Sequence, residues 1–579
     1  MQSVTWKMGG EAGYGIMSSG TMLCRTFSRL GYHVLATNEY PSLIRGGHNL
    51  ITVRIATQEF ASLNKDVHIL VALNKETVDL HKEELTKGAI LLFDPKDHTW
   101  QATDFSKEMQ LVAVPLADIV SEHKGDPVMR NTVALGATVA LLGTDFSAIE
   151  SVIRDQFKRK GQEVIDNNIA IAKAGYDHIK TNFTNQSSMF LSKGEKKEPF
   201  LVINGSEAVG VGAVRAGLKF AAIYPMTPIN SVITFLADHA KELQLVYKQP
   251  EDEIAGINMA IGASIGGVRS MVATSGGGFA LMVEGLSLAG ILEVPLVIDL
   301  GMRPGPATGM PTWTGQGELQ FAIHAGHGEF PRIILAPGDI QEAYSLTVDA
   351  FNLADRYQVP VFILTDKYLN ESQWCAPKSH FQKDVATNRG KLVKEEELAT
   401  DGSFGRYSLE TDDGVSSRSL PGMKNGFYIA NSYEHDEQGY TTELADLAAA
   451  MAQKRLSKLV AIQKVGGAPT VYGERDSEIT FVAWGSTKGP ILEAMKLLGS
   501  KGKKSKLIHF TWLFPFPTEE VTKLLSPVTR LVDVELNTTA QLAFLIREHT
   551  GISITEKILQ CNGRMLYPEE IVERISKVT

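Results

Sequence analysis

The stretch VTWKMGGEAGYG, residues 4–15, shows the pattern that the rest of the chain repeats. Residues that favour a β-strand run directly into a glycine-rich loop, and a helical stretch follows near residues 16–31. Similar short β-rich runs alternate with helical stretches along most of the 579 residues. This alternation is typical of α/β folds built on parallel sheets. A chain of this length is too long for one hydrophobic core, so we expect several domains.

We expect three parallel-sheet α/β blocks. The first spans residues 1–182 and the second spans residues 200–375, with a polar linker at 183–199 between them. The third block spans residues 476–579. Residues 376–475 are polar, with clusters of Gly, Ser and Asp, and predict a long, mostly irregular connection. A connection of that length is uncommon unless it covers a site or wraps a partner.

The composition argues against several classes of protein. The chain is 44% hydrophobic and 21% charged, as ordinary globular proteins are. Its 57 basic and 66 acidic residues give a net charge of −9, which argues against nucleic-acid binding. The start, MQSVTWKMGG, shows no secretory signal, and acids and glycines interrupt the most apolar region, residues 271–302. We therefore expect a cytoplasmic protein without a membrane span.

The three cysteines, Cys24, Cys375 and Cys561, lie far apart in the sequence. They form neither a disulfide framework nor a zinc-binding spacing. They also cannot supply the four ligands of an iron–sulfur cluster within this chain. This cysteine usage indicates a reducing compartment.

The glycine loop that ends the opening stretch is a candidate anion-binding site. Gly10, Gly13 and Gly15 would let backbone N–H groups approach a phosphate at a helix N-terminus. The spacing is not a clean dinucleotide-binding fingerprint, and a tight turn that binds nothing is an equally good interpretation. Further along, Arg45 and His48 flank two more glycines. They could contact an anion or a partner, or belong to a solvated turn.

Two loops of the second block follow predicted strands. In YPMTPIN, residues 224–230, two prolines bracket Thr227 and stiffen the backbone. A rigid loop at the carboxyl end of a parallel strand is where α/β sheets bind ligands. In GMRPGPATGMPTWTGQG, residues 301–317, Arg303 is the only charged residue. It suits a carboxylate or a phosphate, although it could instead pair with an acid of its own chain.

The segment QPEDEIAGINMAIGAS, residues 249–264, brings an acid to the edge of a buried helix. If a helix starts near residue 253, both of its faces are apolar or small, so we expect it to be buried. Glu253 then lies in the first turn, where it could merely interact with the helix dipole, worth about 0.3–1 kcal/mol. Glu251 and Asp252 already offer that interaction. An apolar setting would also hold a carboxyl group ready for proton exchange.

Together these motifs resemble one enzyme family. YPMTP, EDEIAGINMAIGAS, ATSGGGFALMVEG and MRPGPATGMPTWTGQGEL are similar to the α subunit of 2-oxoacid:ferredoxin oxidoreductases, which are thiamine-diphosphate and iron–sulfur enzymes. GGEAGYGIMSSG and MRNTVALGATVALLG resemble the family's γ domain, here fused in front of the α part, and LFPFPTEEV resembles its transketolase C-terminal-like domain. The resemblance covers almost the whole chain. It implies that the three blocks are a γ-like domain, a thiamine-diphosphate pyrimidine-binding domain and a transketolase C-terminal-like domain.

The order of the blocks, with YPMTP and GVSSRSLPG, is most similar to the 2-oxoglutarate synthase branch. That branch implies oxidative decarboxylation of 2-oxoglutarate with CoA to succinyl-CoA, CO₂ and reduced ferredoxin, a reaction that can run in reverse. The resemblance assigns Glu253 the contact with N1′ of the thiamine aminopyrimidine. It assigns Thr227 a contact with the oxo or carboxylate end of the substrate, and Arg303 the pairing with its carboxylate.

The resemblance also implies a CoA site and a second subunit. Gly10, Gly13, Gly15 and Arg45 become candidates for CoA, which carries a diphosphate and a 3′-phosphate. The chain contains neither the GDG motif with which thiamine enzymes hold the diphosphate and Mg²⁺ nor a cysteine cluster, and we expect no metal ligands on it. A β subunit should supply both the diphosphate site and a [4Fe–4S] cluster in an α₂β₂ heterotetramer. Thiamine diphosphate would then lie at the α–β interface, and the chain would be active only with that partner.

Several alternatives stay open. The same chemistry could act on pyruvate, a branched-chain 2-oxoacid or indolepyruvate, because residue spacing does not identify the 2-oxoacid. A second substrate carboxylate would need further polar side chains, for which Arg418 and His435 are candidates, and Pro304 and Trp313 interrupt the usual form of the arginine loop. A dinucleotide-binding oxidoreductase would hold NAD or FAD at the glycine loop instead. A non-catalytic scaffold subunit would use its apolar helices only as an interface.

Overall fold

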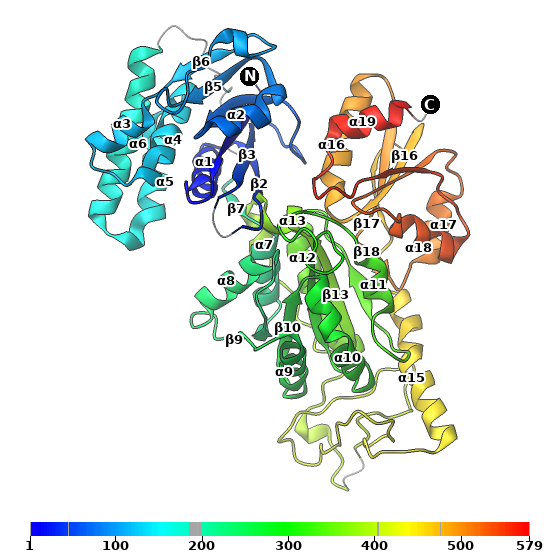
Figure 1. The fold of residues 1–579 in the computed structure, drawn as a ribbon. Helices are drawn as coiled ribbons and strands as arrows, with labels where there is room; N and C mark the ends of the chain where they lie inside the picture. Colours follow the sequence, from blue (N-terminus) through cyan, green and yellow to red (C-terminus); the bar gives the residue numbers. More distant parts are fainter. Residues whose placement is uncertain are drawn as a thin grey trace. The chain divides into compact units, whose positions relative to one another are not determined.

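The computed structural model describes residues 2–43, 46–183, 191, 194, 198–401, 404–474 and 476–577. The chain divides into two compact units (Figure 1). The first unit contains residues 1–204, 371–380 and 567–570. The second unit contains residues 205–370, 381–566 and 571–579.

The first unit is built on an eight-stranded sheet in the order β6-β5-β4-β1-β3-β2-β14-β7. Neighbouring strands pair in parallel along β1 (Ser3–Glu11), β4 (Val67–Ala72), β5 (Leu85–Phe93) and β6 (Gln110–Ala113). The pairing is antiparallel along β1, β3 (His48–Ala56), β2 (His33–Glu39), β14 (Gln373–Pro377) and β7 (Phe200–Ile203). The sheet is therefore parallel in one half only. β2 and β3 are joined as a hairpin, which makes them antiparallel.

Two short strands that were expected in the second block belong to the sheet of the first unit. The sequence analysis placed residues 200–203 and 373–375 in the second block. In the structure, β7 and β14 pair with each other, and β14 also pairs with β2 of the first sheet. A short strand contains little information about its partner, because strand preference depends on tertiary packing.

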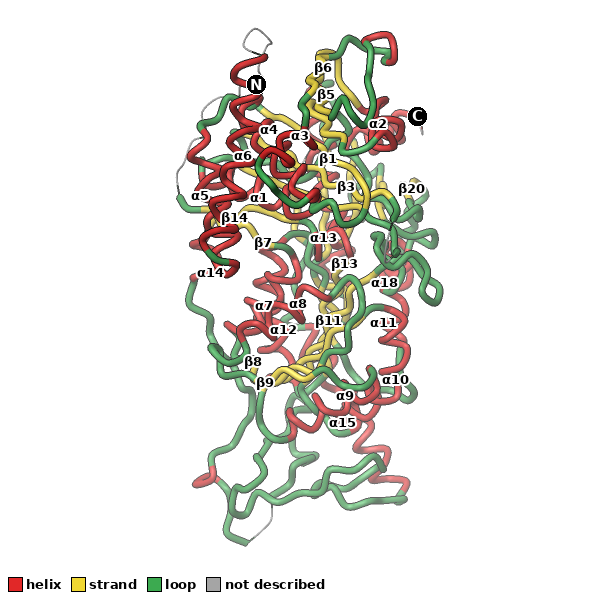
Figure 2. Tube along the Cα trace, turned by 60° about the vertical axis from the view of Figure 1, so that its left-hand side comes forward, coloured by secondary structure: helices red, strands yellow, loops and turns green. Residues whose placement is uncertain are grey.

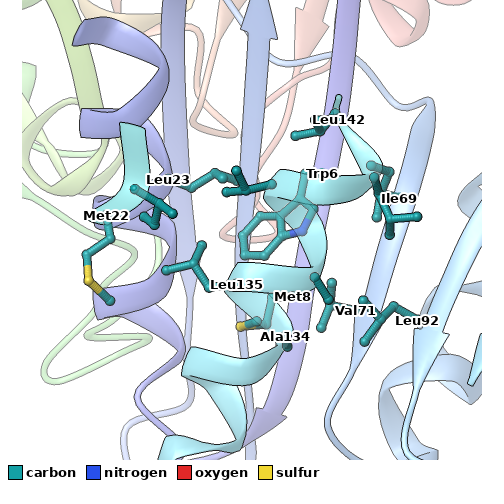
Figure 3. Close-up of a cluster of buried hydrophobic side chains, with 14 of the residues drawn as sticks. Trp6, Met8, Met22, Leu23, Ile69, Val71, Leu92, Ala134, Leu135 and Leu142 are labelled. Carbon is teal, nitrogen blue, oxygen red and sulfur yellow. The ribbon is translucent and has the colours of Figure 1, made fainter. Parts of the chain in front are cut away.

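Six helices pack with this sheet: α1 (Ile16–Arg29), α2 (Lys75–His81), α3 (Leu116–Glu122), α4 (Arg130–Leu141), α5 (Phe146–Phe157) and α6 (Gln162–Asn182). Figure 3 shows part of the core between α1, α4 and the central strands. Trp6 lies at its centre, fully buried, and its indole Nε1 donates to Thr138 Oγ1 at 3.1 Å. α4 and α6 approach closely at Gly136, where a Cβ would lie 1.9 Å from the carbonyl oxygen of Ala172.

The second unit contains two sheets. The larger has seven strands in the order β18-β12-β13-β11-β10-β8-β9, all parallel except for the pairing of β18 with β12. Its strands are β8 (Leu218–Ala222), β9 (Val246–Lys248), β10 (Arg269–Thr274), β11 (Leu296–Met302), β12 (Ile333–Leu335), β13 (Pro360–Asp366) and β18 (Trp512–Phe514). β10, β11 and β13 are buried along their whole length, as central strands of parallel sheets are.

The helices between these strands are α7 (Gly205–Arg215), α8 (Asn230–His239), α9 (Glu253–Ile265), α10 (Gly276–Ile291), α11 (Leu319–His324), α12 (Ile340–Tyr357) and α13 (Lys367–Glu371). The smaller sheet has five strands in the order β15-β17-β16-β19-β20. They are β15 (Thr470–Gly473), β16 (Ile479–Trp484), β17 (Ser505–Phe510), β19 (Leu531–Glu535) and β20 (Glu556–Leu559). The accompanying helices are α16 (Lys488–Ser500), α17 (Thr518–Leu525), α18 (Gln541–Thr550) and α19 (Pro568–Lys577). The three α/β sheets expected from the alternating pattern are confirmed.

The predicted connection at 376–475 contains two helices, α14 (Lys378–Gln382) and α15 (Ala445–Gln463). Between them the described chain is loop, apart from a 3₁₀ turn at Glu395–Glu397 (Figure 2). The sequence analysis did not anticipate α15. Lys454 and Lys458 occupy buried positions of this helix. Charged residues at these positions interrupt the apolar stripe by which a buried helix is usually recognised in a sequence. No described helix combines the length and the apolar composition that crossing a membrane requires.

Candidate active site

Glu253 is the first residue of α9, as the sequence predicted. The helix begins there because the side chain of Asp252 accepts the N–H of Ala255 at 2.8 Å, a normal N-cap. The Glu253 side chain is buried, with 3% of the residue exposed, and its Oε1 has no hydrogen-bond partner within the described chain. Buried polar atoms are almost always paired in native proteins. An unpaired carboxyl oxygen here marks a place where a ligand could supply the missing donor.

Gly278 lets the first turn of α10 pack closely against this carboxyl group. It lies in the first turn of α10, and a Cβ at Gly278 would lie 2.4 Å from Oε1 of Glu253 and 2.1 Å from Oγ1 of Thr274. Thr274 is the last residue of β10, and it is fully buried. The absence of a side chain at Gly278 therefore lets these two buried oxygen atoms pack closely against the N-terminus of α10.

The structure joins the two predicted substrate-binding loops. Arg303 follows β11, and its Nη1 donates to the backbone oxygen of Thr227 at 2.8 Å. Both residues are half-buried. Burial lowers the pKa of Arg303, and the carboxyl of Glu318 opposes that shift. Among the described residues Arg303 has no ion pair within 4.0 Å, but Glu318 is near enough to act on its pKa, so the alternative in which an acid of its own chain holds Arg303 stays open.

The three predicted residues lie at one end of the sheet. Met226, next to Thr227, has its sulfur 4.0 Å from Oγ1 of Thr274, which in turn neighbours Gly278 and the Glu253 carboxyl. These loops follow the carboxyl ends of β8, β10 and β11, where α/β sheets bind ligands. Glu253, Thr227 and Arg303 thus border a continuous region at this edge of the sheet.

Two further acids were not assigned a role by the sequence analysis. Burial raises the pKa of Glu318 to about 7. Its Oε1 would lie 2.7 Å from a Cβ at Gly276, the first residue of α10, and its Oε2 is buried without a partner in the described chain. Burial also raises the pKa of Asp299, in β11, to about 7, and its Oδ1 accepts from Thr365 Oγ1 at 3.1 Å. A lone acid inside the apolar run LVIDLGM was a usable signal for Asp299.

The glycine loop of the first unit forms a strand-to-helix turn. Gly10 lies within β1, near its end. Gly13 and Gly15 follow the strand and have positive φ values of 95° and 67°. Gly15 is the N-cap of α1 and provides no side-chain cap, so the first N–H groups of that helix have no capping side chain. Arg45, which was predicted to accompany this loop, lies outside the described residues. Asn131 Nδ2 donates to the carbonyl oxygen of Gly15 at 3.1 Å and supports the turn.

Arg418 and His435 do not join the site. Arg418 is buried and pairs with Asp355 at 3.1 Å. His435 is 1% exposed, and its Nδ1 lies 3.0 Å from the backbone oxygen of Tyr433. Both residues belong to a mostly irregular segment, and the sequence of such a segment does not indicate which edge of the sheet it approaches. Among the described residues, no group of three or more His, Cys, Asp or Glu side chains could hold a metal ion.

Models of known protein families match most of the chain. Residues 211–454 match the family "Pyruvate flavodoxin/ferredoxin oxidoreductase, thiamine diP-bdg". Residues 5–178 match "Pyruvate ferredoxin/flavodoxin oxidoreductase", and residues 477–571 match "Pyruvate:ferredoxin oxidoreductase core domain II".

Relatives and a solved structure extend this similarity over the full length. 2-Oxoacid:ferredoxin oxidoreductase 2, subunit alpha, from Aeropyrum pernix is 31% identical, covering 100% of this chain and 98% of the relative. The 2-oxoglutarate synthase subunit KorA of Archaeoglobus fulgidus is 32% identical, covering 64% of this chain and 97% of the relative. The structure of the 2-oxoglutarate:ferredoxin oxidoreductase from Magnetococcus marinus with 2-oxoglutarate, coenzyme A and succinyl-CoA bound is 30% identical. The match covers 100% of this chain and 99% of the chain in that structure, with a TM-score of 0.91. The chain therefore belongs to the 2-oxoacid:ferredoxin oxidoreductases, as an alpha subunit.

Proposed function

We propose that this alpha subunit acts on 2-oxoglutarate and, with CoA, yields succinyl-CoA, CO₂ and reduced ferredoxin. The observation that carries the proposal is the buried Oε1 of Glu253, which faces Gly278 without a partner beside the Arg303–Thr227 pair. The choice of 2-oxoglutarate is supported by the names of the Magnetococcus marinus and Archaeoglobus fulgidus proteins. Relatives named only as 2-oxoacid enzymes keep pyruvate, branched-chain 2-oxoacids and indolepyruvate as alternatives.

The residues present fit the pyrimidine half of thiamine diphosphate. The unpaired Oε1 of Glu253 could share a proton with a ring nitrogen of the aminopyrimidine. The cofactor, when bound, supplies the carbon nucleophile and the electron sink for the loss of CO₂. Glu253 would hold the proton at Oε1, and its buried setting would keep water from competing for that oxygen.

Arg303 and Thr227 would bind and orient the substrate. One N–H of the Arg303 guanidinium is used by the Thr227 carbonyl, which fixes the direction of the group and leaves its other donors for a carboxylate. Oγ1 of Thr227 lies 3.5 Å from Nδ2 of Asn230 and could turn toward the oxo group. Partial burial strengthens these interactions relative to water.

The glycine loop of the first unit would bind CoA. The uncapped N-terminus of α1 offers backbone N–H groups to a phosphate, and Gly13 leaves space, since nothing lies within 4 Å of a Cβ there. Gly10, Gly15 and Arg45 complete the proposed set. The anionic CoA phosphates suit a helix N-terminus better than a neutral ligand would.

A β subunit would complete the enzyme. It would supply the diphosphate and Mg²⁺ site and the [4Fe–4S] cluster. The described residues bring no three His, Cys, Asp or Glu side chains together in a group that could hold a metal ion. We propose an α₂β₂ assembly with ferredoxin as the electron acceptor. Exposed apolar side chains on α9 and α10, namely Ile254, Met259 and Leu281, are available for such a partner.

An anaerobic viologen assay on the complex purified from its host tests the proposal. Reduction that requires both 2-oxoglutarate and CoA, and that pyruvate does not drive, is the expected result. Reduction with another 2-oxoacid would retain the family chemistry and overturn the substrate. Absence of reduction with any 2-oxoacid, despite a cluster-bearing partner and added thiamine diphosphate, would favour the scaffold alternative. Binding of a nicotinamide cofactor to the purified complex would favour the dinucleotide alternative.

A further inference from the structure

A small cavity lies in the second unit, far from the sheet edge that holds the candidate active site. It is bordered by the end of α9, the loop between α10 and β11, and the irregular segment that precedes α15; lining residues include Ser264, Glu293, Arg406, Arg418 and Tyr428. The cavity offers about 10 Å³ to the centre of a water-sized particle. That is room for one water molecule or one monatomic ion.

An unused hydrogen-bond donor lines this cavity. Arg406 is 2% exposed, and its Nη2 donates to the backbone oxygen of Glu293 at 2.9 Å. Its Nη1 is buried and has no acceptor within the described chain. A guanidinium stays charged at all physiological pH values, so the unpaired N–H cannot be relieved by losing a proton. The site therefore lacks one acceptor.

Buried cations outnumber buried acids around the cavity. Glu293, 1% exposed, forms ion pairs with Lys454 at 2.6 Å and with Lys458 at 2.5 Å. Both lysines come from α15, and their side chains are 3% and 1% exposed. Arg406 adds a third cation beside the same carboxylate. A single negative charge thus faces three positive charges.

A second acid shows the same imbalance. Asp355, 3% exposed, pairs with Arg269 at 2.8 Å and with Arg418 at 3.1 Å. The half-buried Arg389 also lies 2.8 Å from this carboxylate. Arg418 lines the cavity and connects the two groups. The carboxylates of Glu293 and Asp355 are therefore the two acids that face five buried cations and the half-buried Arg389.

Other nearby charges do not correct this excess. Arg455 pairs with Glu434, and Lys391 pairs with Asp413, so each of these pairs is neutral. The carboxyl ends of α9, α10 and α12 lie here, and each contributes roughly half a negative charge. With Lys458 about half protonated near pH 7, the five buried cations still exceed the two acids and three helix ends by roughly one charge. Burial lowers the pKa of Lys458 to about 7, while Glu293 opposes the shift and Lys454 and Arg406 add to it.

We propose that the cavity binds one halide ion, chloride under ordinary conditions, at Nη1 of Arg406. A water molecule would satisfy the donor but would leave the excess positive charge, whereas polyatomic anions exceed the space. The ion would tie the irregular segment and α15 to the ends of α9 and α10. α9 has 13 residues and spans roughly 20 Å, so the ion would not touch the chemistry at Glu253. This inference is independent of the proposed substrate.

Thermal unfolding of the purified α–β complex in sodium chloride and in sodium gluconate, at equal ionic strength, tests the site. We expect the melting temperature to rise by roughly 2–5 °C in chloride, since only the folded state binds the ion. KM and kcat should change little at temperatures below the transition. A rise that gluconate or sulfate reproduces equally would overturn the proposal, because it would show no preference for a monatomic anion.

Crystals of the complex grown with bromide in place of chloride give a second readout. An anomalous peak within hydrogen-bonding distance of Nη1 of Arg406 is the expected result, and density for water without a peak would refute the site. Lys458→Gln should abolish most of the chloride-dependent shift. Lys464→Gln, which changes an exposed lysine at the end of the same helix, should preserve the shift. If Lys458→Gln fails to fold, the bromide experiment on the unmodified complex still decides.

Discussion

The carboxyl group of Glu253 faces the α-carbon of Gly278, where a methyl group would approach Oε1 to 2.4 Å. The two residues lie in the first turns of neighbouring helices, α9 and α10, and both are buried. A glycine at this position lets the acid lie buried against α10, while its Oε1 has no hydrogen-bond partner within the described chain. That combination suits a group that exchanges a proton with a ligand and does not pair within its own chain.

Glu253→Gln should remove most turnover and leave the fold intact. Glutamine preserves the shape of the side chain but cannot exchange a proton at Oε1, a role worth roughly 10²–10⁴-fold in rate. Viologen reduction by the α–β complex measures the loss, and thermal unfolding checks the fold. Glu251→Gln, which changes an exposed acid two residues earlier, should retain activity. Equal activity of the two variants would exclude the proposed role of Glu253.

Gly278→Ala should inactivate the enzyme, whereas Gly277→Ala should be tolerated. A methyl group at residue 278 would collide with Glu253 and with Oγ1 of Thr274, at 2.4 and 2.1 Å. At residue 277 the nearest atom is the backbone oxygen of Ala307, 3.9 Å away. Both changes add the same methyl group to the same helical turn, where alanine is favoured over glycine by about 1 kcal/mol. Binding of thiamine diphosphate, followed by calorimetry, should weaken only in Gly278→Ala.

Arg303→Met should raise KM for the 2-oxoacid. The guanidinium is oriented by the Thr227 carbonyl, and loss of a charged hydrogen bond costs about 1.5–3 kcal/mol, or roughly ten- to a hundredfold in kcat/KM. Arg303→Lys keeps the charge but loses the forked geometry, so it should be intermediate. Steady-state kinetics with varied 2-oxoglutarate measure the effect. An unchanged KM in Arg303→Met would mean that another group holds the carboxylate.

Much of the candidate site could be predicted from local sequence, because its residues follow strands. Thr227 and Arg303 come directly after β8 and β11, and the edge of a parallel sheet brings such loops together. Glu253 was recognisable as an acid at the start of an apolar helix. In these cases the local pattern and the sheet topology point to the same place.

The rest depended on contacts between distant segments. β14 joins the first sheet although it lies more than 160 residues beyond β7 in the chain, and its five residues contain no signal for that partner. Lys454 and Lys458 appear solvated in the sequence, but tertiary packing buries them against Glu293. Glu318 could not be assigned either, since its raised pKa results from burial. Propensity and periodicity do not report burial of charged side chains.

Asp299→Asn should flatten the dependence of stability on pH. Burial raises the pKa of Asp299 to about 7 in the folded protein, whereas an unfolded aspartate titrates near about 4. The folded state therefore binds this proton more tightly, so its contribution to stability is complete below about pH 4 and is lost as the pH rises through about 7. The free energy of unfolding of the unmodified complex should fall by on the order of 2–4 kcal/mol from this group between pH 5 and pH 8.

Asparagine has no such proton to lose, and its amide can still accept from Thr365 Oγ1 through its oxygen. Denaturant unfolding at several pH values between 5 and 8 measures the slope. Asp384→Asn, at an exposed position, serves as the control and should leave the slope unchanged. Glu318, whose pKa burial also raises to about 7, should account for part of the slope that remains in Asp299→Asn. If Asp299→Asn retains the full slope, Asp299 must already be ionised in the fold at low pH, with a donor for Oδ2 supplied from outside the chain.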